Sequence, residues 1–392
     1  MSQQTLFLHR SVFIAIGTGI VLAALLLLCA WQHAIYSSTP PAQPHRHSLA
    51  ELTINPAIQQ KAEQELTRSI EATHALGGQC LVMNPTTGEL LAYVLLPKGN
   101  LAHKQPALPI DVDCGYFEPG GTFDIMPVVA ALEEGVARDG QTITNCTSAM
   151  SVGNHVIHEA HHAHGKVDLQ RILTESCNIG CATLALKLGP VRFRTWCEKM
   201  GFGKRTGLEI SHECPGTLNF RNMHSRITLA NMGFGQSLAV TPQQLLATYA
   251  VVANGGEWVQ PRLLKATVKN DATAPAATAR RRVCSEKTAA LLRSYLEDVV
   301  KHGTGKQAAI PGYRIAGKTG TSQKAFSGGY RAGAMIATFA GIMPVDQPRL
   351  VILVIVDEPH SSYYGGVVAA PVAREVGRFA LKQMGITPVA HR

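Results

Sequence analysis

The sequence has few charged residues and almost no dense runs of charge. Charged residues make up 16% of its 392 residues and apolar residues 46%, values that are typical of a packed globular chain and exclude a disordered one. Lys and Arg exceed Asp and Glu by 36 to 27, and the net charge of +9 favours acidic partners such as anionic lipid head groups or carboxylate-rich polymers. The only dense basic run is Arg280–Arg282, with no recognition motif beside it, which argues against nucleic-acid binding.

The cysteines lack the spacing of a metal or redox motif. None of the nine forms a C-x-x-C pair, so a zinc ribbon or a thioredoxin-like site has no support. Cys29 lies in an apolar run and the other eight follow it. In an oxidising compartment these eight could form disulfides, whose pairing the sequence does not assign, and buried thiols are an equal alternative.

A single apolar run is long enough to cross a membrane, which excludes a multi-pass protein. Residues 12–30 carry no charge, and as a helix they span about 28 Å, close to the hydrocarbon core of a bilayer. His9 and Arg10 precede the run. We therefore expect a cytoplasmic tail at residues 1–11, a transmembrane anchor at 12–31 and the remaining chain outside the cytoplasm. A cleaved signal peptide is the alternative, but no convincing cleavage site follows.

The rest of the chain predicts a linker and one α+β domain. Residues 32–50 contain Pro40, Pro41 and Pro44 and predict an extended linker, followed by a domain at 51–386 and a tail at 387–392. Asn55 and Pro56 are typical of a helix start. Apolar periodicity predicts further helices near 123–136, 168–188, 241–253, 285–300 and 369–384, and strands near 80–83, 90–96, 313–318, 334–343 and 349–356. Residues 270–282 have no periodicity and predict a loop.

Four motifs follow one another along the predicted domain. They are P-G-G-T-F-D at residues 119–124, S-C-N at 176–178, a glycine-containing segment at 231–242 and K-T-G-T at 318–321. In this order they resemble the transpeptidase domain of class B penicillin-binding proteins, most of all the division-type D,D-transpeptidases. A single four-residue match recurs by chance, whereas the ordered set does not. The resemblance implies the serine β-lactamase-like fold of these proteins, an antiparallel sheet flanked by helices, preceded here by one transmembrane helix.

The resemblance also implies a three-part catalytic cleft, of which the first part is broken. The family places a serine nucleophile and a lysine base in an S-x-x-K motif, where this chain has Gly121 and Asp124, and no other S-x-x-K occurs. Removing a nucleophile costs on the order of 10⁶ in turnover. We therefore expect no catalytic residue, and a pseudoenzyme that acts by binding, as a scaffold or regulator in peptidoglycan synthesis or cell division.

The other two motifs supply the residues of a substrate cleft. These are Ser176, Asn178, Lys318, Thr319, Gly320 and Thr321. They predict non-covalent binding of a peptidoglycan stem peptide or a β-lactam. An equal alternative is that these motifs remain as part of the fold and have no binding role. Asp124 and Lys318 should project into the same cleft and pair, which lowers the availability of the lysine for a ligand carboxylate. Cell-wall synthesis or division proteins are the other expected partners, and we expect no cofactor and no metal ion.

An active transpeptidase with an unorthodox nucleophile is the first alternative function. Thr122 should point away from the cleft, and Cys177 likewise. Ser176 keeps a hydroxyl, but we expect no partner base at the family's geometry and no nucleophile beside Asp124.

A metal-dependent hydrolase is the second alternative. His158, Glu159 and His162 match H-E-x-x-H, a spacing that places two imidazoles on one face of a helix. Five of the 16 histidines lie within residues 155–164, so a chance match is expected there. We therefore favour a solvent-exposed histidine-rich loop.

Overall fold

The computed structural model describes residues 51–96, 115–160, 163–210, 213–219, 222, 224–265, 279–326 and 329–388. The predicted cytoplasmic tail, membrane anchor and linker lie outside these residues. Among the helices within the described ranges, none combines the length and the apolar character that a membrane crossing requires.

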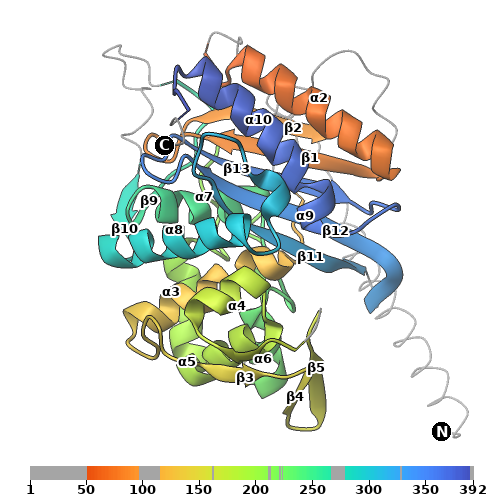
Figure 1. The fold of residues 1–392 in the computed structure, drawn as a ribbon, viewed down its shortest axis with the longest axis vertical. Helices are drawn as coiled ribbons and strands as arrows, with labels where there is room; N and C mark the ends of the chain where they lie inside the picture. Colours follow the sequence, from red (N-terminus) through yellow and green to blue (C-terminus); the bar gives the residue numbers. More distant parts are fainter. Residues whose placement is uncertain are drawn as a thin grey trace, which may run out of the picture. The chain divides into compact units, whose positions relative to one another are not determined.

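A five-stranded antiparallel sheet forms the centre of the fold (Figure 1). Its spatial order is β11-β12-β13-β1-β2, with β1 (Gly77–Met83), β2 (Leu90–Leu96), β11 (Ala316–Phe326), β12 (Gly329–Met343) and β13 (Leu350–Asp357). The middle strand β13 is apolar and buried over all but its last residue, because helices cover both faces of the sheet. The predicted α+β architecture is confirmed, although β11 begins and ends later than expected.

One face of the sheet is covered by α2 (Pro56–Thr73) and α10 (Ala370–Gln383) (Figure 1). Asn55 caps α2 as predicted, since its side-chain oxygen accepts hydrogen bonds from the backbone N–H groups of Ala57 and Ile58. The buried stripe of α2 packs with α10 and the sheet in one apolar core. This layer lies on the face opposite the motifs.

The other face of the sheet carries the helices that position the motifs. They are α3 (Ile125–Glu133), α4 (Leu169–Glu175), α5 (Asn178–Met200), α6 (Arg226–Gly233), α7 (Pro242–Ala253) and α8 (Glu286–Lys301). The long helix predicted at 168–188 is in fact two, because Ser176 adopts a left-handed backbone with φ of 56° that ends α4. Cys177 then caps α5. The S-C-N motif is therefore a helix junction.

Short elements complete the fold. They are η2 (Gly120–Phe123), η3 (Lys306–Ala308), α9 (Gly365–Val368) and four strand pairs, β3 (Thr144–Cys146) with β6 (Gly165–Val167), β4 (Ala149–Val152) with β5 (His155–His158), β7 (Thr217–Leu218) with β8 (Leu238–Ala239), and β9 (Glu257–Val259) with β10 (Arg280–Arg282). The loop prediction was wrong at its end, where β10 forms. β10 has no apolar periodicity that would predict it, because it is held by contacts of its arginine side chains. Arg281 stacks on Trp258 at 4.5 Å, and Arg282 pairs with Glu257.

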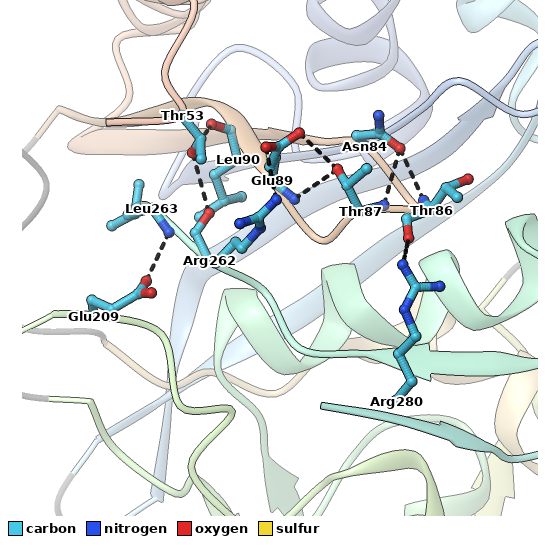
Figure 2. A network of polar contacts seen from close by, with 10 residues as sticks. All are labelled: Thr53, Asn84, Thr86, Thr87, Glu89, Leu90, Glu209, Arg262, Leu263 and Arg280. Atoms are coloured by element: carbon cyan, nitrogen blue, oxygen red, sulfur yellow. Dashed lines mark hydrogen bonds and ion pairs between the residues drawn. The ribbon is translucent and has the colours of Figure 1, made fainter. Parts of the chain in front are cut away.

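The turn between β1 and β2 is held by the polar network of Figure 2. Asn84 accepts hydrogen bonds from the backbone N–H groups of Thr86 and Thr87. Glu89 forms an ion pair with Arg262 at 2.8 Å, which joins the turn to the segment after β9. These contacts account for the N-P-T-T-G-E segment at residues 84–89 forming a turn.

Candidate functional site

A groove of about 1150 Å³ lies beside β11 and is bordered by α9, β5 and the junction of α4 with α5. The predicted cleft residues that line it are Ser176, Asn178, Thr319 and Thr321, together with Gly121. Lys318 and Gly320 are buried under the groove. The fold thus brings all the predicted site residues to one place.

Gly121 lies in η2 against the wall of this groove, with no space for a larger side chain. A Cβ atom added to it would lie 2.7 Å from Ser176 Oγ, 2.8 Å from the Thr319 carbonyl oxygen and 3.1 Å from Lys318 Nζ. These neighbours occupy the volume that a serine at position 121 needs. Thr122 offers no replacement, since it is fully buried and its hydroxyl donates to the Pro119 carbonyl. The prediction that Thr122 points away from the cleft is confirmed.

Asp124 and Lys318 form a buried ion pair, as predicted. Asp124 Oδ2 lies 3.0 Å from Lys318 Nζ, and both side chains are at most 1% exposed. Burial raises the pKa of Asp124, and the adjacent ammonium of Lys318 offsets part of this rise. Lys318 Nζ also donates to Ser176 Oγ at 2.7 Å and to the Thr319 carbonyl at 3.2 Å. Asp124, Ser176 and Thr319 thus occupy the three N–H groups of the ammonium. Lys318 therefore has no N–H group left for direct contact with the carboxylate of a ligand.

Ser176 joins both members of the ion pair. Its hydroxyl donates to Asp124 Oδ2 at 2.9 Å and accepts from Lys318. The expectation that no nucleophile stands beside Asp124 was wrong, because α3 packs on α5 and brings together residues that are 52 positions apart in the chain. A serine hydroxyl hydrogen-bonded to a carboxylate is one element of a nucleophile–base pair.

The remaining residues of the groove are tied to neighbouring elements. Asn178 donates to the His158 carbonyl at 3.1 Å, and the hydroxyls of Thr319 and Thr304 share a hydrogen bond of 2.6 Å. Thr321 Oγ1 accepts from the Gly365 N–H at 3.2 Å, which leaves its hydroxyl proton to donate to a ligand. The polar wall of the groove is therefore held by contacts within the chain.

A second polar cluster, which none of the four motifs predicts, lies behind the S-C-N junction. Single donor atoms of Cys146, Glu159 and His164 lie within 4.8 Å of one another, and Cys177 Sγ is 3.6 Å from Glu159 Oε1. Both thiols are fully buried, and burial raises the pKa of each and that of Glu159. Neither thiol is in a disulfide. The prediction that Cys177 points away from the cleft is confirmed.

The H-E-x-x-H segment does not form the helix that a zinc hydrolase of this type requires. His158 is an exposed residue at the end of β5, whereas the side chain of Glu159 turns inward, so the two do not share a face. His162 lies outside the described residues. The expectation of a solvent-exposed loop was also wrong in part, because residues 155–158 form a strand and His164 is buried.

The fold and the groove define the class of protein. The family described as penicillin binding protein transpeptidase domain matches residues 78–377. The chain belongs to this family, and the resemblance inferred from its motifs is confirmed.

Individual relatives place the chain among class B members of the family. Stage V sporulation protein D of Bacillus subtilis is 33% identical over 355 residues, which are 86% of this chain and 54% of the relative. Peptidoglycan D,D-transpeptidase FtsI of Escherichia coli is 32% identical over 350 residues, 88% of this chain and 58% of the relative. The chain thus spans little more than half the length of these relatives.

A solved structure shows the same architecture. Penicillin-binding protein 3 of Mycobacterium tuberculosis, complexed with aztreonam, is similar with a TM-score of 0.77 and 30% identity, over 87% of this chain and 80% of that one. The penicillin-binding protein transpeptidase fold is therefore established on both sequence and structure.

Proposed function

We propose that this chain is a non-acylating member of the family that binds peptidoglycan stem peptides non-covalently and acts in cell-wall synthesis or cell division as a scaffold or regulator. The observation that carries the proposal is the packing at Gly121. Glycine has no atom that can form an acyl bond, and the Thr319 carbonyl and Ser176 hydroxyl fill the space of the lost side chain.

The energetic consequence of this packing is large. Loss of the nucleophile removes on the order of 10⁶ in turnover, about 8 kcal/mol of transition-state stabilisation. Asp124 brings a carboxylate to the position of the family's lysine, and its pair with Lys318 stabilises the charged form. Burial raises the pKa of this carboxylate, but a carboxylate engaged by Lys318 remains a weaker base for an alcohol than the amine of the family's lysine, so the second half of the catalytic pair is lost as well.

The groove itself supports a binding role. Asn178, Thr319 and Thr321 remain along it, and the similar mycobacterial protein has been solved with the β-lactam aztreonam. We propose further that residues 12–31 anchor the chain as a single-pass protein in the inner (cytoplasmic) membrane, with the domain in the periplasm or extracytoplasmic space. The apolar run and the basic residues before it support this placement. The names of the relatives support partners among cell-wall synthesis or division proteins.

Covalent labelling tests the proposal. The purified chain is incubated with a fluorescent penicillin and its intact mass is measured. We expect no adduct. We also expect a stem peptide to quench the intrinsic fluorescence of the chain saturably at equilibrium. A mass increase by one opened lactam would contradict the non-acylating function, whereas absence of both adduct and saturable binding would leave no role for the groove.

An active transpeptidase that uses Ser176 is a second candidate, and the hydrogen bond from Ser176 to Asp124 favours it. In that reaction Ser176 Oγ attacks the carbonyl carbon, the hydroxyl proton passes through Asp124 to the leaving nitrogen, and the C–N bond breaks. The donation from Lys318 to Ser176 Oγ opposes this reaction, since it engages an oxygen lone pair. An adduct that maps to Ser176 and disappears in Ser176→Ala would establish it.

A further inference from the structure

Four side chains with metal-binding atoms converge behind the groove from four separate segments. Cys146 ends β3, Glu159 follows β5, His164 precedes β6 and Cys177 caps α5. Three of their donor atoms lie within 4.8 Å of one another, and the thiol of Cys177 lies 3.6 Å from the Glu159 carboxylate. Ligands of a tetrahedral zinc ion stand about 3.3–3.8 Å apart, given bonds of about 2.0–2.3 Å, so a small inward shift completes the site.

The carboxylate of Glu159 gives independent evidence for a cation. Its side chain is only 1% exposed, and Oε2 receives no hydrogen bond from the residues that the structure describes. This oxygen points towards His164 Nε2 at 3.9 Å, a distance too long for a hydrogen bond. A buried carboxylate oxygen without a donor is costly unless a cation lies against it.

Two backbone N–H groups offset part of the cost of burying the charged, metal-binding forms of two ligands. The Gly180 N–H donates to Cys177 Sγ at 3.1 Å, and the Ile179 N–H donates to Glu159 Oε1 at 2.6 Å. Both donors belong to the first turn of α5, whose N-terminal end favours a thiolate and a carboxylate.

The histidine is oriented in a manner that suits a metal ligand. His164 Nδ1 faces the Glu175 carboxylate at 3.8 Å, while Nε2 faces the cluster. A carboxylate on the second ring nitrogen is the usual outer contact of metal-bound histidine.

We propose that Cys146, Glu159, His164 and Cys177 bind one zinc ion in a closed structural site. Two thiolates, an imidazole and a carboxylate select zinc, and four buried protein ligands leave no coordination position for substrate. Because Cys177 lies between two residues of the groove wall, the ion fixes that wall against β3 and β6. This inference does not rest on the proposed function, since a structural ion would support an acylating groove equally.

Metal analysis of the full chain, purified without a histidine tag, tests the site. We expect about one zinc ion per chain by elemental mass spectrometry, and less than about one tenth of an ion in Cys146→Ser and in Glu159→Gln. Cys197→Ser is the matched control, because Cys197 is a buried cysteine of α5 outside the cluster. It should keep the full zinc content. Equal zinc in Cys146→Ser and the unmodified chain would overturn the proposal.

A second measurement needs no variant and so is independent of misfolding. An organomercurial reagent is titrated into the unmodified chain while a metallochromic dye reports zinc, which should be released as thiols are modified. Chelator treatment should lower Tm, and added zinc should restore it. A chain that takes up no zinc when incubated with it, a Tm insensitive to the chelator, or a disulfide between Cys146 and Cys177 would each refute the site.

Discussion

Two buried polar clusters lie on opposite sides of the S-C-N junction, and they differ in charge balance. In the first, the carboxylate of Asp124 meets the ammonium of Lys318, with Ser176 between them. In the second, Glu159 and His164 lie beside two thiols, with no lysine or arginine among the four. The comparison indicates that the carboxylate of the first cluster is neutralised from within the chain, whereas in the proposed zinc site a cation from outside the chain would neutralise the second cluster.

The largest expected effect comes from rebuilding the catalytic pair in the first cluster. Gly121→Ser combined with Asp124→Lys should give a chain that penicillin labels covalently, because Ser176 and Lys318 lose the carboxylate that holds them against position 121. The measurement is the labelled fraction over time. If penicillin does not label the double variant, the Thr319 carbonyl has not moved to accommodate the serine side chain.

The single change Gly121→Ser is the matched control for this gain. With Asp124 in place, the added Cβ meets the Thr319 carbonyl oxygen at 2.8 Å. The amine of Lys318 lies 3.1 Å from that Cβ, but it is engaged by Asp124 and cannot serve as the base. We expect no labelling and a lower Tm. Labelling of the single variant as fast as the double one would show that Asp124 can serve as the base.

Breaking the ion pair should give the second largest effect. Asp124→Ala leaves the ammonium of Lys318 buried without its counter-charge, and we expect a loss of about 3–5 kcal/mol in the free energy of unfolding. Urea denaturation measures it. Asp124→Leu with Lys318→Met removes both charges and should recover most of that loss, so a double variant as unstable as the single one would contradict the ion-pair account.

The pH dependence of stability should have opposite signs at two buried acids whose pKa values are shifted in opposite directions, Asp124 and Glu297. Burial raises the pKa of Asp124 above its ordinary value of 3.8. The folded chain thus holds this proton more tightly, and the contribution of Asp124 is complete below that value and lost as pH rises through the folded pKa. The stability of the unmodified chain relative to Asp124→Asn should therefore fall as pH rises above 3.8.

Glu297 is the comparison for this pH series. Hydrogen bonds from Arg314 hold its pKa below 4.5, so its contribution is present above that value and lost as pH falls through the folded pKa. The stability of the unmodified chain relative to Glu297→Gln should therefore decrease on acidification. If stability relative to Asp124→Asn and stability relative to Glu297→Gln change with pH in the same direction, the raised pKa assigned to Asp124 is contradicted.

The contacts that could be predicted from sequence differ physically from those that could not. The sheet and most helices follow from local apolar periodicity, and the pairing of Asp124 with Lys318 follows from motifs whose positions in one fold are known. The contact of Ser176 with Asp124 depends on the packing of α3 against α5, which no local pattern encodes. Cys146 and His164 meet through the pairing of β3 with β6, so the sequence shows only a cysteine near a histidine-rich segment.

The smallest expected effect concerns a single hydroxyl of the groove outside both clusters. Thr321→Val removes a hydroxyl that lines the groove and accepts from the Gly365 N–H. One lost hydrogen bond should weaken stem-peptide binding by about threefold to tenfold, since such bonds contribute about 0.5–1.5 kcal/mol. Thr195→Val, on the exposed side of α5, is the matched control and should bind as the unmodified chain does. Calorimetric titration separates the two, and equal affinity of both variants would place the peptide elsewhere than along β11.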